Sequence, residues 1–334
     1  LVIANDGAET TEPQPLPVKA KLVGLDRDMS VQQAMAKIAE ACLTHMEANE
    51  AAVREGRDPE GVHQMRVAVR RLRSALSILR HCLPDDLAAR LQLELRWFAD
   101  QLSPARDWDV FKESCLQPAI ARMPDRSEVA ALLRQVEDRR LEAYGVAIAS
   151  VNAPRYGGLK SLLRAWLDQD IGATLKRKRR RQLAMPVADM AADVLQRRHK
   201  KLRQLGGRHR VQSLPELHAL RIKTKKLRYA AEFFRQLYPP AAQGRYHAAV
   251  AGLQEVLGHI NDAAVAQERL HELTPAPSAD LPLPGLVPDV RPEIARHLDL
   301  VIAEQRDAFR AAWRKFRRCE PFWQRRGGKG SRPQ

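Results

Sequence analysis

The chain has 334 residues, a formal net charge of +16, a hydrophobic fraction of 45% and an aromatic fraction of only 5%. This excess of positive charge predicts an acidic partner, namely nucleic acid, an anionic membrane surface or another phosphate-rich polyanion. The sequence has no apolar run of membrane-spanning length and no signal-peptide pattern, so we expect no membrane partner. Four cysteines without a C-x-x-C pair favour a reducing, cytoplasmic setting.

Apolar residues recur at spacings of three and four, which predicts an all-α protein. We expect residues 1–27 to be a linker or the tail of an upstream domain, because the chain starts at Leu1 rather than Met. A helix is predicted over 28–57, with Ser30 as its N-cap, and Ser103-Pro104 is expected to end a later helix. The other helices of this half are predicted at 59–84, 85–102, 105–122 and 126–151, with a short one ending at 166.

Six consecutive cations at 176–181 divide the chain and indicate a mobile basic linker with non-specific affinity for phosphate. We therefore place a first half at 28–173, the linker at 174–185, a second half at 186–324 and a flexible tail at 325–334. Six prolines at 274–292 indicate a loop. Helices of the second half are predicted at 186–205, 217–235, 240–258, 261–273 and 293–318.

The segment Val62–Arg80 carries five arginines and no acid. On a helix, its apolar residues form one stripe and its basic residues form an adjacent stripe. A row of guanidiniums repels itself, so the basic stripe predicts a polyanion along the helix. The alternative is an ordinary exposed helix face, although such faces usually mix both signs of charge. The apolar stripe is Met65, Ala68, Val69, Leu72, Ala75, Leu76 and Leu79, and the basic one is His63, Arg66, Arg70, Arg73 and Arg80.

A second copy of this pattern occurs 155 residues later, at Leu217–Arg235, where Glu232 is the only acid. The same offset relates Asp107 to Asp262 further along the chain. We interpret the chain as a tandem duplication. In this alignment His63 corresponds to His218, Arg66 to Arg221, Arg70 to Lys225, Arg71 to Lys226, Arg73 to Arg228 and Arg80 to Arg235.

His63 and His218 begin the two basic faces, and each is expected to hydrogen-bond phosphate or to orient an arginine. A metal site would need further ligands at i+3 or i+4, so no metal is predicted. Those positions hold Arg66, Val67, Arg221 and Ile222. Two interpretations stay open for Asp107 and Asp262: each caps a helix, or each forms an ion pair that holds an arginine in place.

The doubled motif H-x-x-R-x-x-x-R-R-x-R in a helical chain resembles the CHAD domain, the conserved-histidine α-helical domain. The first copy matches fully, and the second has Lys225 and Lys226 at two arginine positions. The segments LSPARDWDV (102–110) and LGHINDAAV (257–265) resemble the paired turn motifs of the family, and WRKFRRCEPFW (313–323) resembles its C-terminal signature. The resemblance covers about residues 28–324.

This resemblance implies two pseudosymmetric four-helix bundles whose basic helices line a shared groove or pore. Members of the family bind inorganic polyphosphate and often follow a triphosphate-tunnel (CYTH) domain, of which Leu1–Ala4 would be the tail. The resemblance also implies a location at polyphosphate granules. The polyphosphate-binding residues are then expected to be His63, Arg66, Arg70, Arg71, Arg73, Arg80, His218, Arg221, Lys225, Lys226, Arg228, Arg235 and Arg314.

The sequence thus predicts a non-catalytic module that binds inorganic polyphosphate, uses no cofactor, and binds nucleic acid only non-specifically. One alternative is an RNA-binding protein, which should interleave aromatic residues with its cations for base stacking. The first basic helix has no aromatic residue, and the second has Tyr229, Phe233 and Phe234. The other alternative is an accessory domain of a triphosphate-hydrolysing enzyme. Phosphoryl transfer needs metal-binding carboxylates, and none clusters with the motif.

Overall fold

The structure, a computed structural model, describes residues 15–123, 127–168, 175–207, 213–273 and 289–324. These residues form an all-α protein, in which the one β-bridge joins Ser30 to Pro186. None of the described helices combines the length and apolar character that crossing a bilayer requires. The predicted tail at 325–334 and most of the predicted loop at 274–292 lie outside the described residues.

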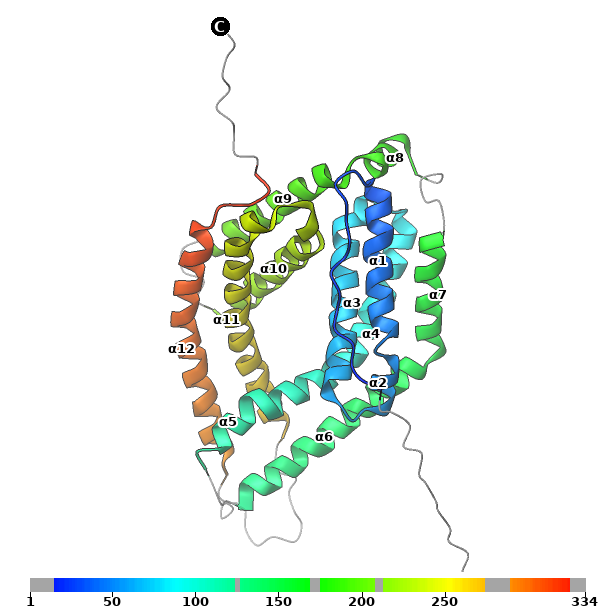
Figure 1. Ribbon diagram of the computed structural model, residues 1–334. Coiled ribbons are helices and arrows are strands. Elements are labelled where there is room, and N and C mark those ends of the chain that lie inside the picture. Colours follow the sequence, from blue (N-terminus) through cyan, green and yellow to red (C-terminus); the bar gives the residue numbers. More distant parts are fainter. Residues whose placement is uncertain (1–14, 124–126, 169–174, 208–212, 274–288, 325–334) are drawn as a thin grey trace, which may run out of the picture.

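Helices from the two parts of the chain lie side by side in Figure 1, with the N-terminal ones in blue to green and the C-terminal ones in green to red. The first part contains α1 (Val31–Glu47), α2 (Glu50–Glu55), α3 (Pro59–Leu79), η1 (Arg80–Cys82), α4 (Asp85–Val110), the π-helical η2 (Phe111–Leu116), α5 (Gln117–Ile120), α6 (Ser127–Asn152) and α7 (Pro154–Asp168). The second contains α8 (Arg177–Ala184), α9 (Val187–Gly207), α10 (Leu214–Phe233), η3 (Arg235–Leu237), α11 (Pro240–Glu272) and α12 (Arg291–Arg318).

The predicted N-cap of the first helix is confirmed. The Ser30 hydroxyl accepts a hydrogen bond from the Gln33 backbone, and the Gln33 side chain accepts one from the Ser30 N–H. The single helix predicted over 28–57 is wrong, because the chain turns between α1 and α2. At that turn the buried Asn49 side chain donates to the carbonyl oxygens of His45 and Val18, so it competes with continued helical pairing.

The break predicted at Ser103-Pro104 is also wrong, since α4 continues through both residues. A proline inside a helix costs about 3 kcal/mol. Here Leu102, Ala105 and Trp108 are all buried at helical spacing, and the area they remove from water offsets that cost. The corresponding break predicted between 258 and 261 is also absent. Here too burial favours a continuous helix, because α11 buries one side over its whole length.

The basic run 176–181 is not a mobile linker, because Arg177–Ala184 forms α8 and packs against α1 and η1. Its Arg179 guanidinium donates to the Leu83 carbonyl at 3.1 Å and pairs with the Asp85 carboxylate at 3.1 Å. Pairing with a backbone carbonyl and an acid fixes this segment, so its cations are partly used within the fold.

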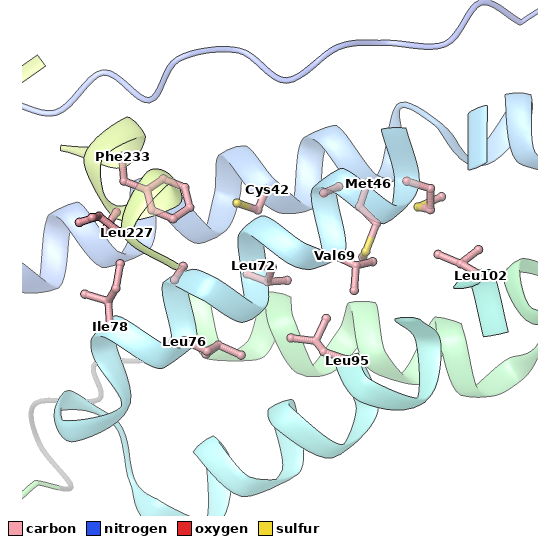
Figure 2. Close-up of a cluster of buried hydrophobic side chains, with 14 of the residues drawn as sticks. Cys42, Met46, Val69, Leu72, Leu76, Ile78, Leu95, Leu102, Leu227 and Phe233 are labelled. Atoms are coloured by element: carbon pink, nitrogen blue, oxygen red, sulfur yellow. The ribbon is translucent and has the colours of Figure 1, made fainter. Parts of the chain in front are cut away.

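Both parts of the chain share one hydrophobic core. The predicted apolar stripe of α3 is fully buried, from Met65 to Leu79. Figure 2 shows Phe233 and Leu227 of α10 beside Ile78 of α3, with Cys42 of α1 close by. Side chains of the second part therefore complete the core of the first, which holds α3 and α10 in contact.

An extended segment at 15–27 runs along these helices. The Val18 N–H donates to the Asn49 side chain at 2.9 Å, and Arg71 donates to the Lys21 carbonyl at 3.2 Å. Val23 is buried in the core. At its end Arg27 donates to the Leu237 carbonyl at 2.7 Å, which connects this segment to the second part of the chain.

Arg71 is a structural residue, because its side chain is 2% exposed and its guanidinium lies 5.6 Å from the Phe233 ring centroid. Arg71→Ala would leave a cavity and an unpaired Lys21 carbonyl, so we expect the free energy of unfolding to fall by about 2–3 kcal/mol. Arg73→Ala, on the exposed side of the same helix, should change it by less than about 0.5 kcal/mol. Urea denaturation of both variants measures this difference, and equal losses would contradict the assignment.

Candidate functional site

The basic faces of α3 and α10 meet at four basic side chains, which we call the basic cluster: Arg66, Arg70, Arg221 and Lys225. Because the two helices are in contact, Nη1 of Arg70 lies 3.4 Å from the Tyr229 hydroxyl oxygen and donates a hydrogen bond to it. Burial lowers the pKa values of Arg66, Arg221 and Lys225, and the charge of Arg70 lowers each of them further. Two stripes 155 residues apart in sequence thus form one positively charged site.

Two carboxylates lie beside the basic cluster. Arg66 pairs with Asp107 at 3.8 Å, and Arg221 pairs with Asp262 at 3.6 Å. Because Asp107 lies within α4 and Asp262 within α11, the helix-cap interpretation is wrong and the ion-pair interpretation is confirmed. Each aspartate follows its arginine by the same number of residues, so corresponding positions make corresponding contacts.

These ion pairs neutralise the site incompletely. Burial lowers the pKa of Arg66 to about 10, and burial raises the pKa of Asp107, although each partner favours the charged form of the other. The nitrogen of Arg66 and the oxygen of Asp107 are 3.8 Å apart, which is too far for a hydrogen bond. The ion pair therefore compensates for only a small part of the hydration that both groups lose on burial. Arg66 remains protonated at neutral pH all the same. The aspartates therefore orient the arginines without cancelling their charge.

A nearby pair shows how this fold builds a fully satisfied ion pair. Asp109, two residues beyond Asp107, is 1% exposed and accepts a 2.9 Å hydrogen bond from Arg140. The Tyr144 hydroxyl donates to the other Asp109 oxygen at 2.9 Å. Hydrogen bonding by Asp109 opposes the effect of burial and leaves the pKa of Arg140 raised. Asp109 thus connects α4 to α6 through hydrogen bonds. Asp107 makes no such close hydrogen bonds among the described residues.

The basic cluster also has unused hydrogen-bond donors. Nε and Nη1 of Arg66 and Nε of Arg221 are buried and have no hydrogen-bond partner among the described residues. A guanidinium carries five N–H donors in a planar fork that matches the oxygens of carboxylate and phosphate. Buried donors without acceptors are costly, so the site is suited to an anion that supplies several oxygens.

Lys225 lies among three of these guanidiniums. Burial lowers its pKa to about 6, with further lowering by Arg70 and Arg221. Asp262 opposes this shift but does not overcome it. Near neutral pH Lys225 is therefore largely in its neutral amine form. An anion placed beside it would favour the charged ammonium form.

The two histidines occupy different surroundings. His63 is half-buried beside Arg106, Arg70 and Arg66, and burial together with these cations lowers its pKa to about 4, so its ring is neutral. His218 is exposed, and its Nδ1–H donates to Asn261 at 2.7 Å. His218 also borders a cavity of about 970 Å³ between α10, α11 and α12, whose lining is largely apolar. His63 therefore lies directly beside the basic cluster, whereas His218 is connected to it through Asn261, whose side chain donates to Asp262 at 3.3 Å.

The other predicted residues divide by location. Arg71 is in the core and does not reach the site. Arg73 and Lys226 lie together near α9, and Arg228 and Arg235 lie near His247 of α11. Arg80 is the first residue of η1, directly after α3, and Arg314 lies on α12; both are exposed, and no described ion pair or hydrogen bond joins them to the basic cluster.

Two further cations were missed by the sequence analysis. Arg269 of α11 pairs with Asp107 at 3.9 Å and lies 5.1 Å from the Trp108 ring centroid. The sequence pattern could have identified Arg269, because it follows Asp262 by seven residues and so lies on the same helix face. Arg106 lowers the pKa values of His63 and Arg66, and it was overlooked because a helix break was expected beside it.

Comparison with known proteins agrees with this description. The family model of the CHAD domain matches residues 37–271. The crystal structure of the CHAD domain from the plant Ricinus communis is 31% identical, with a TM-score of 0.69, and the match covers 90% of this chain and 96% of that one. PptA from Streptomyces chartreusis shares the fold at 17% identity, with a TM-score of 0.62, over 87% of this chain and 99% of that one. A search of curated proteins found no match. The chain belongs to the CHAD domain family.

Proposed function

We propose that this CHAD domain binds inorganic polyphosphate through the basic cluster and does not turn it over. The observation that carries the proposal is that the four basic side chains of the basic cluster come together from two helices, with two loosely paired carboxylates beside them. Polyphosphate offers a negative charge and several oxygens at every repeat. Arginine binds such oxygens two at a time, and lysine adds a point charge.

The aromatic residues of α10 argue against RNA as the preferred ligand. Phe233 and Phe234 are buried in the core, so neither offers a ring to a base. The Tyr229 ring packs against the core, and its hydroxyl accepts a hydrogen bond from Arg70. Base stacking on exposed rings is the usual source of affinity for single strands. A ligand recognised by charge density alone fits the site better.

The surroundings of the two aspartates support binding without catalysis. Asp107 faces Arg66 and Arg269, and Asp262 faces Arg221. Guanidiniums at these distances repel a divalent cation, and phosphoryl transfer relies on metal ions held by carboxylates. We therefore infer a binding module that holds the polymer intact. We also propose a cytoplasmic location, because the cysteines form no C-x-x-C pair. A location at polyphosphate granules and an upstream CYTH domain are further proposals, which rest on the family resemblance.

Competition binding tests the proposed ligand. Long-chain polyphosphate should displace single-stranded RNA from the full chain at matched phosphate concentration, because it carries more charge per unit length and needs no stacking surface. Fluorescence anisotropy of labelled RNA measures the displacement. The polyphosphate should be recovered at full length after prolonged incubation with magnesium. Stronger binding of RNA would reject the ligand, and release of orthophosphate would reject the non-catalytic assignment.

The basic cluster can be tested with one substitution from each helix. The double variant Arg70→Gln, Lys225→Gln should bind polyphosphate at least about 100-fold more weakly, since each charge-assisted hydrogen bond is worth about 1.5–3 kcal/mol. Its melting temperature without ligand should stay unchanged or rise, because like-charge repulsion is relieved. The control is Arg317→Gln, Arg318→Gln, which removes two exposed cations from the end of α12. Equal losses of affinity in both variants would show that only net charge matters.

Lys225 should couple binding to proton uptake. Its pKa in the free protein is about 6 because of burial and the nearby Arg70 and Arg221, and bound phosphate should raise it. Above about pH 6, binding then takes up a proton, so affinity falls as pH rises from about 7 to about 9. His63, with a pKa of about 4, stays neutral in this range.

Calorimetric titration in two buffers with different ionisation enthalpies measures the proton uptake. The variant Lys225→Arg keeps its charge throughout, so uptake should disappear while binding persists. Proton uptake that is unchanged in Lys225→Arg would assign it to another group.

The lowered pKa of Lys225 also affects the stability of the protein without ligand. The unfolded lysine holds its proton up to its ordinary pKa of 10.5, so the folded state should gain stability as pH rises between about 6 and 10.5.

A further inference from the structure

The cavity beside His218 is a feature of the molecule that polyphosphate binding does not use. It has a volume of about 970 Å³ and lies between α10, α11 and α12, with α11 packed against both of the other helices. Leu217, Leu257 and Ile260 are buried side chains of its largely apolar wall. Small-molecule sites in proteins commonly have volumes of about 300–1,000 Å³ and apolar walls with a few polar groups. The cavity therefore has the size and the character of a small-molecule site.

The first part of the chain has a related pair of helices, between which large polar side chains fill the space. There α6 packs against α4, as α12 packs against α11 in the second part. Asp109 of α4 accepts hydrogen bonds from Arg140 and Tyr144 of α6, and both Asp109 and Tyr144 are buried. These three side chains close the space between α4 and α6.

The 155-residue offset of the repeated motif places smaller residues at these positions in the second part. Each of the three side chains has a counterpart that lines the cavity: Ala264 for Asp109, Ala295 for Arg140 and Asp299 for Tyr144. Buried residues of the two helices follow the same offset: Ala143 and Ala147 of α6, Leu298 and Ile302 of α12. A methyl group and a short carboxylate thus replace a guanidinium and a phenol ring, which leaves room for another molecule.

Acidic groups predominate among the charged residues of the lining, in a chain whose net charge is +16. The titratable lining residues are three acids, one arginine and two histidines: Glu268, Asp289, Asp299, Arg291, His218 and His271. Arg291 is already paired with Asp289 at 2.7 Å. Glu268 and Asp299 form no ion pair with a cation of the described residues. Two further arginines, Arg306 and Arg310, line a smaller adjoining hollow and not this cavity.

We propose that this cavity binds a small amphipathic cation, a molecule with an apolar body and an ammonium group. The apolar body covers the wall formed by Leu217, Leu257 and Ile260, which removes that surface from water. The ammonium group lies beside Glu268 and Asp299, where it meets opposite charge. This site is additional to the basic cluster, whose ligand carries the opposite charge.

Two probes of equal chain length and opposite charge test the proposal. Decyltrimethylammonium is the cation and decyl sulfate is the anion, and each is titrated into the full chain below its critical micelle concentration. Isothermal titration calorimetry should show one saturable site for the cation. Decyl sulfate is expected to bind only at basic surfaces of the protein, so changes to the cavity should leave its binding unaltered.

A filling variant and a charge variant locate the site. Ala264→Leu, Ala295→Leu places apolar side chains in the cavity, so binding of the cation should weaken at least about tenfold while the melting temperature stays unchanged or rises. Glu268→Gln, Asp299→Asn keeps the shape of the cavity and should weaken binding about fivefold, because both acids are partly screened by water. This second variant carries the test if the first fails to fold.

Matched control variants make the same changes at exposed positions of the same two helices. Ala251→Leu, Ala311→Leu adds two leucines outside the cavity, and Glu255→Gln, Glu304→Gln removes two acids outside it. Both controls should bind decyltrimethylammonium within about twofold of the unmodified chain.

Four outcomes would overturn the proposal. Failure of the cation to saturate one site would show that the cavity takes no such ligand. Unchanged binding in the filling variant would place the bound cation elsewhere. Binding of decyl sulfate that the filling variant abolishes would show that the cavity prefers an anion. A dimer of the unmodified chain that becomes a monomer in the filling variant, measured by light scattering, would make the cavity an interface between two copies.

Discussion

Like-charge repulsion between α3 and α10 is the constraint on which the other features of the site depend. Two helix faces that carry Arg66, Arg70, Arg221 and Lys225 would separate in water if nothing else held them. Apolar packing on their opposite sides prevents this, because α10 side chains such as Phe233 complete the core around α1 and α3. The hydrophobic core thus supplies the free energy that keeps an unfavourable cluster of charge assembled and ready for an anion.

The ion pairs of Asp109 and Asp107 are of two different kinds, and geometry separates them. Asp109 accepts 2.9 Å hydrogen bonds from both Arg140 and Tyr144, and it is shielded from water. Asp107 lies 3.8 Å from Arg66 and 3.9 Å from Arg269, which also pairs with Glu272 at 2.7 Å, and Asp107 leaves much of the charge of Arg66 unmet. The first arrangement stabilises helix packing. The second orients arginines while their donors stay free, which is the preorganisation that an anion site needs.

Neighbouring cations on one helix have different roles because each residue turns the side chain by about 100°. Arg70 points to Tyr229 across the α3–α10 contact, and Arg71 is buried under the extended segment at 15–27. Arg73 lies on the exposed side toward α9. A basic motif read as a single ligand-binding unit therefore contains a site residue, a structural residue and an exposed residue outside the basic cluster.

Helical periodicity and the repeated H-x-x-R motif were enough to predict an all-α chain, the buried stripe of α3 and the family to which the chain belongs. Those features depend on local spacing, which the sequence carries directly. The continuity of α4 through Pro104, the burial of Arg71 and the different surroundings of His63 and His218 were decided by tertiary structure. Each depends on which distant helix packs against the residue. Burial can outweigh a local breaker or draw a charged side chain out of water, and no local pattern records that contact.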